Sequence, residues 1–410
     1  MTARPVSVIV VSRHRAAALR RCVTGIGQLD HPNLELIVVA DPAGLAALGD
    51  GAFKAVAFDV PNISAARNLG LDQAAGEVVA FIDDDAVPEP TWLRRLVAPF
   101  DDPKVAAAGG FVRGRNGLSL QWRAMEVDRL GQDRPLEVAT DRATVRAGSA
   151  DRAVKTQGTN CAFRRATLAA IGGFDEALHF YLDEADVNLR LAAAGHLSAV
   201  VPGAEVHHGF AESARRNADR TPRTLFDISA SSAVFLRRHA PAPDWDGALR
   251  ALRVAQRQRL EAFRARGAMD PAEAGRLMAT LEDGIAAGLA RDLPPLVPRS
   301  AQPGPFRPLP GTGPRAGCVL AGRPWSRKRR AAEAERRAGA EIVTVLNLGP
   351  TARPHHARFR PEGYWEQTGG LFGRADRAGP RFALWLFSRR VRHEIARIGA
   401  NRPTGAQRPP

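Results

Sequence analysis

Glu77-Val78-Val79-Ala80-Phe81-Ile82-Asp83-Asp84-Asp85 is the stretch that decides how this chain is interpreted. A short apolar run of this kind predicts a buried strand. The three aspartates that follow it should lie at the carboxyl end of a sheet, where open α/β sheets bind ligands. Adjacent carboxylates repel one another, so their clustering favours a compensating cation. A divalent ion bridging a nucleotide diphosphate fits, because Mg²⁺ uses few protein carboxylates and completes its shell with phosphate oxygens.

The same acids have a simpler interpretation. Pro90-Thr91-Trp92-Leu93 indicates the start of a helix, and an acidic turn before that helix needs no ligand. The residues of this stretch leave both interpretations open, so the surrounding pattern of strands and helices has to favour one of them.

The first 110 residues alternate between strand and helix patterns. Apolar runs predict strands at residues 6–11, 34–40, 55–60 and 77–82. Helical spacing of apolar residues predicts helices at residues 16–26, 62–75 and 91–100. The second of these helices begins after a cap at Asn62 or Ser64. Near-continuous apolar strands joined by helices predict an α/β fold with a mostly parallel central sheet that is covered on both faces.

Beyond residue 110 the pattern is less regular, and residues 114–152 suggest no element. We expect further strands at residues 105–112, 155–163, 197–202 and 204–207. We expect two further helices, at residues 164–171, stopped by Gly172-Gly173, and at residues 185–194.

Composition divides the chain into four parts: residues 1–221, 222–291, 292–314 and 315–410. The first part holds the α/β pattern. The second is rich in helix signals and carries an amphipathic stripe typical of core packing at Leu249, Leu252, Leu260 and Phe263. The third is a linker with eight prolines, for which extended conformations are expected. The fourth predicts a small α/β region with a strand, a helix and a strand at residues 317–320, 327–339 and 341–346.

Charge is concentrated at the end of the chain. Residues 311–410 hold 20 Lys/Arg and 7 Asp/Glu, a net charge of +13 out of +15 for all 410 residues. A basic segment of this kind suits an anionic partner such as a membrane surface, a polyanionic acceptor or nucleic acid. Nucleic acid is the least favoured of these partners, and a solvated arginine-rich surface is the simpler alternative.

Cysteine usage and hydropathy predict where the protein resides. Cys22, Cys161 and Cys318 lie far apart with no CxxC pair, so neither a disulfide framework nor a zinc site is expected. The start of the chain enters a strand pattern directly, without a signal-peptide pattern. No apolar run approaches the roughly 20 residues that cross a bilayer. We therefore expect a cytoplasmic protein, peripheral at most at the inner face of the membrane.

A second acidic cluster, Asp183-Glu184-Ala185-Asp186, opens the helix expected near residue 185. A carboxylate there is suited to act as a general base toward a substrate hydroxyl. The helix macrodipole alone also favours acids in a first turn, which is the structural alternative. His207-His208 follows the last expected strand of this region, where an imidazole would complete a cation site begun by Asp85 or would be merely structural.

Two further segments suit a nucleotide. Ser64-Ala65-Ala66-Arg67-Asn68 opens a helix, and a helix N-terminus with an arginine favours a diphosphate. Asp41 ends the expected strand at 34–40 and is placed to accept hydrogen bonds from a nucleobase or ribose. Each has a simpler interpretation, as a surface arginine and as a turn-forming aspartate.

Together and in this order, these pieces resemble the family 2 glycosyltransferases over about residues 4–215. The resemblance rests on residues 6–11, 36–41, 66–70, 81–85, Gly158-Thr159-Asn160-Cys161-Ala162-Phe163-Arg164-Arg165, Gly172-Gly173-Phe174-Asp175-Glu176 and Tyr181-Leu182-Asp183-Glu184-Ala185-Asp186-Val187-Asn188-Leu189-Arg190-Leu191. It implies a GT-A-type nucleotide-binding domain. It also implies inverting transfer of a sugar from a nucleoside-diphosphate sugar to a hydroxyl acceptor, a saccharide or lipid-linked saccharide, in surface polysaccharide or glycoconjugate synthesis.

The resemblance also implies roles for single residues. Asp85 corresponds to the ligand of Mg²⁺ or Mn²⁺, and His207 or His208 to a histidine that completes the cation site. The donor site is expected at Ser12, Asp41, Arg67, Asn68, Asp83, Asp84 and Asn160.

The family's catalytic base comes from a Glu-Asp pair before a Leu-x-x-Arg pattern. Counting back from Arg190, that pair falls on Asp183-Glu184, with the two acids swapped and Val187 in place of the leucine. We expect Glu184 to be the base, with Asp183 or Asp186 as substitutes. Two rival interpretations are a nucleotidyltransferase, whose Gly-rich loop is missing at Ser12-Arg13-His14-Arg15, and a non-catalytic nucleotide-sugar-binding protein.

Overall fold

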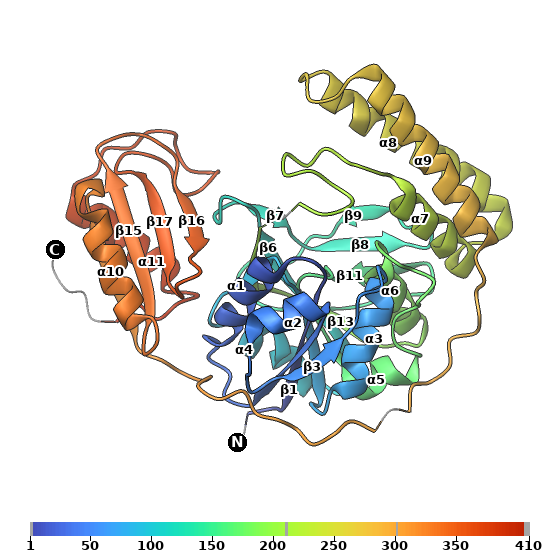
Figure 1. The fold of residues 1–410 in the computed structure, drawn as a ribbon, viewed down its shortest axis with the longest axis horizontal. Helices are drawn as coiled ribbons and strands as arrows, with labels where there is room; N and C mark the ends of the chain where they lie inside the picture. Colours follow the sequence, from blue (N-terminus) through green and yellow to red (C-terminus); the bar gives the residue numbers. More distant parts are fainter. Residues whose placement is uncertain (1–2, 210–211, 301, 406–410) are drawn as a thin grey trace.

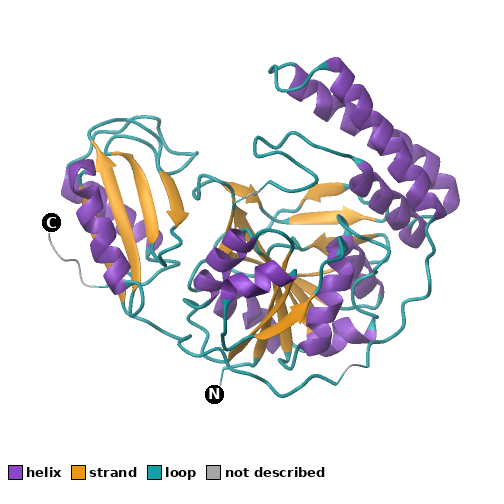
Figure 2. Ribbon diagram, viewed as in Figure 1, coloured by secondary structure: helices purple, strands orange, loops and turns teal. Residues whose placement is uncertain are grey.

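The computed structural model describes residues 3–209, 212–300 and 302–405, and its core is a ten-stranded mixed sheet (Figures 1 and 2). The main path of the sheet runs through β10 (Thr144–Ala147), β13 (Leu197–His208), β6 (Val105–Arg113), β12 (Cys161–Arg164), β4 (Val78–Asp83), β1 (Val6–Ser12), β2 (Leu34–Ala40) and β3 (Lys54–Ala57). β5 (Ala86–Pro88) pairs with β13, and β7 (Leu120–Trp122) pairs with β6. Strands β3, β2, β1 and β4 are parallel, whereas β12 is antiparallel to both of its neighbours.

Helices cover both faces of this sheet, as predicted. Successive side chains of a strand point to opposite faces, so Val8 and Val10 pack with α1 (Ala16–Ile26) and α4 (Trp92–Val97). Ile9 faces the other way, toward α3 (Ile63–Gln73), α5 (Arg165–Ala170) and α6 (Asp183–Ala193). Asn62 caps α3 by accepting a hydrogen bond from the Ala65 N–H at 3.1 Å. The sheet and its two helical layers thus fix the strand ends at which the candidate side chains lie.

The structure corrects four local expectations. Residues 155–163 are not one strand but β11 (Arg152–Lys155) and β12, because a turn bridged between Gln157 and Asn160 separates them. The two strands expected at 197–202 and 204–207 are the single irregular strand β13. A helix absent from the prediction, α2 (Pro42–Leu48), follows β2. The unassigned residues 114–152 include β8 (Met125–Asp128) and β9 (Asp133–Pro135), which form a second sheet with β11.

The helical segment consists of α7 (Phe226–His239), α8 (Trp245–Arg264) and α9 (Pro271–Ala290), with α8 and α9 at the upper right of Figure 1. Leu249, Leu260 and Phe263 are buried in the core between these helices, so the stripe on α8 is core packing. None of the helices in the described ranges is both long and apolar enough to cross a membrane.

The proline-rich linker follows the surface of the α/β domain rather than hanging free. Arg299 forms an ion pair with Asp72 through two nitrogens, at 2.5 and 2.9 Å. The Leu309 N–H donates to the carbonyl of Leu34 at 2.8 Å. The linker therefore returns the chain to the edge of the sheet near β2.

The C-terminal region is a four-stranded sheet ordered β14 (Gly317–Gly322), β15 (Ile342–Gly349), β17 (Trp365–Gly370) and β16 (His356–Phe359). It contains the predicted strand–helix–strand unit, whose helix α10 (Arg327–Arg337) packs on one face of the sheet. The second helix, α11 (Phe387–Ile398), packs on the other face. The observed groups of elements agree with the predicted α/β class and its helical and C-terminal parts. The domain boundaries near residues 221, 291 and 314 stay predictions.

Candidate functional site

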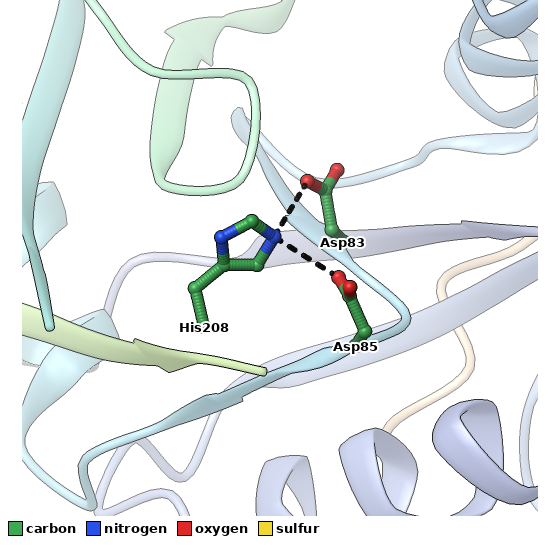
Figure 3. Close-up of side chains that lie close together, drawn as sticks. All are labelled: Asp83, Asp85 and His208. Carbon is green, nitrogen blue, oxygen red and sulfur yellow. Dashed lines mark ion pairs between the residues drawn. The ribbon is translucent and has the colours of Figure 1, made fainter. Parts of the chain in front are cut away.

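Three predicted residues meet where β4 and β13 end (Figure 3). The Nε2 atom of His208 lies 3.1 Å from an oxygen of Asp85 and 3.9 Å from an oxygen of Asp83. One ligand atom from each of the three residues lies within 4.8 Å of the others. His208 reaches the acids because β13 pairs with β5, which places His208 opposite Ala86, the residue after Asp85. Two carboxylates and an imidazole at this separation form a donor set suited to a divalent cation.

Neighbouring aspartates of the cluster have different environments. The side chain of Asp83 is 30% exposed, whereas that of Asp85 is almost fully buried. Asp84 is buried and turned inward, where it accepts a hydrogen bond from the Ser12 hydroxyl at 2.6 Å. Burial raises the pKa of Asp84 well above its usual range, although the nearby Arg15 opposes this shift. The buried hydrogen bond between Ser12 and Asp84 therefore connects the end of β1 to the loop between β4 and β5.

Two arginines that sequence reasoning did not select lie beside these acids. Arg15 contacts Asp84 at 2.6 Å and Asp85 at 3.4 Å, and Arg216 lies 3.7 Å from Asp85. Their positive charge offsets part of the repulsion within the aspartate cluster. The basic run at residues 12–15 was the sequence signal that could have identified Arg15. The pairing of β1 with β4 gives this signal its meaning, because it places the residues after β1 next to the aspartates after β4.

Arg67 connects the two acidic clusters. It is buried on α3, donates through Nη1 to Asp183 and through Nη2 to the carbonyl of Gly158 at 3.1 Å, and lies 3.6 Å from Asp83. Burial alone would lower the pKa of Arg67, but the negative charges of Asp183 and Asp83 outweigh it and raise that pKa. A buried guanidinium held this way is a fixed positive charge between the clusters.

The second acidic cluster begins at strained backbone. Tyr181 and Leu182 both have positive φ angles, 79° and 66°, immediately before α6 starts at Asp183. Such conformations cost roughly 1–3 kcal/mol each in non-glycine residues and persist where surrounding structure holds them. Asp183, the first residue of α6, accepts a hydrogen bond from Arg67, and the next residue, Glu184, is half-buried.

The three acids of this cluster are not equivalent. Glu184 is half-buried, and its partial removal from water together with the charge of Asp183 raises its pKa to about 8. Asp186 is fully buried and bonded to Arg190 and His239 at 2.5 and 2.9 Å, and these partners hold its pKa near 2 despite burial. Asp183 and Asp186 are thus engaged in ion pairs, and Glu184 has the raised pKa that suits a proton acceptor near neutral pH.

Three residues expected at the donor site are bonded within the protein. Asn160 accepts from the Trp92 indole at 2.7 Å and donates to the carbonyls of Phe111 and Ala204. Asn68 exchanges hydrogen bonds with the backbone of Phe174, which pins the Gly172–Glu176 loop. Asp41 accepts from the backbone N–H groups of His14 and Gly44 at 2.7 and 3.1 Å, so it caps α2. The side chains of these residues therefore organise the surroundings of the site, and a direct contact of any of them with a donor stays a prediction.

The two histidines face opposite sides of β13. His207 points away from the acid cluster and bonds Glu89 at 2.7 Å, and its ring lies 4.7 Å from that of Trp365 in the C-terminal region. Arg402 holds the same Glu89 with two bonds of 2.6 Å, and its guanidinium lies over the ring of Trp365. His208 is therefore the histidine beside the acids, and His207 belongs to the contact between the α/β domain and the C-terminal region.

This contact gives a stability prediction. The pKa of Glu89 is held well below its usual 4.5, because Arg402 and His207 outweigh the effect of burial. Arg402→Ala leaves a buried carboxylate without its main partner and should destabilise the fold by about 3–5 kcal/mol in urea unfolding at pH 7. The loss should be full above pH 4.5 and shrink as the pH falls further, because protonated Glu89 no longer needs the pair. Arg381→Ala, at an exposed residue of the same region, is the control, and equal stability of the two variants would contradict this assignment.

Two hollows adjoin the Asp83–Asp85–His208 group. One is lined by Ser12, Asp83 and the start of α3 at Asn62 and Ile63, together with Phe180. The other contains Asp85 and His208 and is closed on one side by Arg358 and Phe359 of β16. The C-terminal region, for which the sequence predicted no role in the site, thus lines the space next to the acid cluster.

Comparison with known proteins decides the family. Residues 3–225 match the sequence profile of the family described as glycosyltransferase like family 2. The chain belongs to this family. The match confirms the predicted family 2 glycosyltransferase over the N-terminal half of the chain, and the mixed sheet agrees with the GT-A-type fold expected there.

Individual relatives are more distant. The pre-mycofactocin glycosyltransferase of Mycobacterium tuberculosis is 30% identical over 217 residues, which cover 50% of this chain and 43% of the relative. The O-antigen biosynthesis protein RfbC of Myxococcus xanthus is 27% identical over 250 residues, 55% of this chain and 18% of the relative. The chain therefore spans less than half the length of these curated relatives. A mannosyltransferase from Pyrobaculum calidifontis, solved with GDP-Man and Mn²⁺, superimposes with a TM-score of 0.41 at 20% identity, over 70% of this chain and 88% of that one.

Proposed function

We propose that this protein is a metal-dependent, inverting glycosyltransferase that moves a sugar from a nucleoside-diphosphate sugar to a hydroxyl acceptor. One observation carries the proposal: Arg67 joins the Asp83–Asp85–His208 group to the Asp183–Glu184 pair. A cation site, a fixed positive charge and a proton acceptor with a raised pKa are the parts that displacement of a diphosphate by a hydroxyl requires.

The residues present fit a divalent metal ion. Asp85, Asp83 and His208 offer two oxygens and one nitrogen at mutually close positions, and Asp85 is buried where an unneutralised carboxylate is costly. We propose that these three residues hold Mg²⁺ or Mn²⁺ together with the donor diphosphate. Such an ion supplies Lewis-acid stabilisation of the leaving diphosphate. His207, bonded to Glu89, is left out of this ligand set.

Residues of this chain account for the transfer of the acceptor's proton and for the departure of the nucleoside diphosphate. Glu184 accepts the proton of the acceptor hydroxyl while that oxygen forms its bond to the anomeric carbon. The bond from the anomeric carbon to the diphosphate oxygen breaks in the same step, and the nucleoside diphosphate leaves with the bonding electrons. Attack and departure occur on opposite faces of the sugar, so a single displacement inverts the anomeric configuration. Arg67 faces the negative charge that develops on the diphosphate.

The raised pKa of Glu184 predicts a pH profile. A base must be ionised to accept a proton, so with a pKa of about 8 the turnover rate should rise about tenfold per pH unit below neutrality and level off above pH 8. Asp186, whose pKa is near 2, would instead give a flat profile above pH 4. Initial rates at saturating donor between pH 5.5 and 9 separate the two residues, and a flat profile over this range would contradict the assignment of Glu184.

Product analysis tests the reaction class. The protein is incubated with UDP-, GDP- and dTDP-sugars, Mn²⁺ and saccharide or lipid-linked saccharide acceptors, and products are identified by mass spectrometry. Release of a nucleoside diphosphate and a glycosylated acceptor supports the proposal, with a role in surface polysaccharide or glycoconjugate synthesis. In a parallel assay with a nucleoside triphosphate and a sugar 1-phosphate, formation of a nucleoside-diphosphate sugar with release of pyrophosphate would identify a nucleotidyltransferase. Donor binding without any product in either assay would identify a binding protein.

A further inference from the structure

The C-terminal region carries an unusual set of exposed apolar side chains. Trp325, Leu384 and Leu386 are 79%, 82% and 66% exposed. Single exposed leucines are ordinary, but a tryptophan and two leucines grouped on one small region are not. Trp325 follows β14, one edge strand of the four-stranded sheet, and the two leucines precede α11. The opposite edge strand, β16, is the one that lines the hollow next to the acid cluster.

Local backbone explains why the leucines point outward. Residues 383–386 precede α11 without forming a helix, and Leu386 has extended dihedral angles. Side chains alternate along an extended segment, so Leu384 and Leu386 share one side and Trp385 takes the other. Trp385 is half-buried and turned toward α11, with its ring 5.0 Å from His393 and 5.5 Å from the Arg390 guanidinium. The packing of Trp385 therefore fixes the two leucines toward solvent.

A hollow lies beside Trp325 and the start of α11. A depression of about 760 Å³ runs between the edge of β14 and the starts of α10 and α11, and Trp325 and Phe387 both line it. Arg323 lies over the Phe387 ring at 4.5 Å, which joins the tryptophan side of the hollow to the leucine segment. Trp325 and Phe387, about sixty positions apart in the sequence, thus meet at this hollow. We call the lining of the hollow, together with Leu384 and Leu386 just before Phe387, the Trp325 surface.

The charge around the Trp325 surface is positive. Its lining includes Arg329 and Arg336, and its one acidic member, Glu333, is already paired with Arg336 and Arg337. Lys328 on α10 and two arginines on the first turns of α11, Arg389 and Arg392, are exposed. No ion pair involving these two arginines occurs within the described ranges, so their charge is available to an anionic partner.

We propose that the Trp325 surface docks on an anionic lipid bilayer. Tryptophan and leucine side chains insert at the boundary between headgroups and acyl chains, and arginines beside them contact lipid phosphates. Each basic residue near such a membrane strengthens binding by about fivefold, and the excess of basic over acidic groups in this region supplies many of them. The proposal concerns a partner of the C-terminal region and does not depend on the transferase activity.

Vesicle flotation tests the proposal on the full chain. Wild-type protein should float with phosphatidylcholine vesicles that contain 30% phosphatidylglycerol and should bind pure phosphatidylcholine at least about tenfold more weakly. The triple variant Trp325→Ser/Leu384→Ser/Leu386→Ser and the double variant Arg389→Glu/Arg392→Glu should each lose at least about tenfold in affinity. Arg250→Glu/Arg257→Glu on α8 makes the same charge change at exposed residues elsewhere and should bind like wild type.

Three results would overturn the proposal: absence of vesicle binding by the wild type, unchanged binding by the triple variant, and equal loss in the α8 control. A fall in mass from dimer to monomer in the triple variant, measured by light scattering, would instead assign the surface to a second copy of the chain. Circular dichroism melting checks that the variants fold, which is expected because the substituted side chains are exposed.

Discussion

Asp85→Asn is expected to weaken Mn²⁺ binding in the presence of a nucleoside diphosphate by at least about 100-fold. Asp85 is the most buried acid of the proposed ligand group and lies 3.1 Å from His208. Asparagine preserves size and removes the negative charge, so the change isolates coordination from packing. Electron paramagnetic resonance of free Mn²⁺, titrated against protein with UDP, GDP or dTDP present, measures the affinity directly.

Asp101→Asn provides the matched control for Asp85→Asn. Its side chain is 85% exposed and lies outside the ligand group, so the same chemical change should leave Mn²⁺ binding within about twofold of wild type. Equal Mn²⁺ affinity in wild type and the Asp85 variant would remove Asp85 from the site and with it the proposed cation.

Glu184→Gln is expected to lower the turnover rate by about 10²–10⁴-fold, the usual contribution of a general base. Donor binding should change little, because Arg67, Asp83 and Asp85 remain in place. Glutamine is also expected to preserve the fold, since Glu184 is half-buried and its negative charge beside Asp183 is unfavourable. Rates of nucleoside diphosphate release and donor affinity by calorimetry separate the two effects.

Glu176→Gln is the control for this substitution, because Glu176 is exposed and lies on the loop that Asn68 anchors. Wild-type turnover in Glu184→Gln would move the base to Asp183. That residue is tied to Arg67, so Asp183→Asn would then be expected to affect both stability and rate.

The strands and the two acid clusters were predictable because their signals are local. An apolar run such as Val78–Ile82 is buried wherever the sheet forms, and acids after it must lie at its end. The turn within 155–163 was missed because the run on both sides is equally strand-like, and only the pairing of β12 with β4 and β6 shows where each strand begins.

The choice between His207 and His208 illustrates a limit of a different kind. Neighbouring residues of a strand face opposite sides, so the sequence implied that only one of them would face Asp85. Which one depends on the register of β13 against β5 and on the contact of Glu89 with Arg402, more than 300 positions away. The same holds for the Trp325 surface, which joins segments that only the four-stranded sheet brings together.

The family motifs also mix two kinds of residue. Arg67 and Asp83 border the proposed site, whereas Asn68 and Asn160 use their polar atoms to hold the loops around it. A sequence motif contains residues that contact a ligand and residues that hold a loop in place, and the motif alone does not distinguish the two roles. Only the hydrogen-bond partners separate them.

The most direct test of the central claim is a calorimetric titration of the wild-type protein with UDP-, GDP- and dTDP-sugars, each with and without Mn²⁺. The account predicts that at least one nucleotide sugar binds, that binding requires the cation, and that Asp85→Asn abolishes it. Binding of the same strength without any divalent cation, or no binding across the panel with Mn²⁺ present, would contradict a metal-dependent glycosyltransferase.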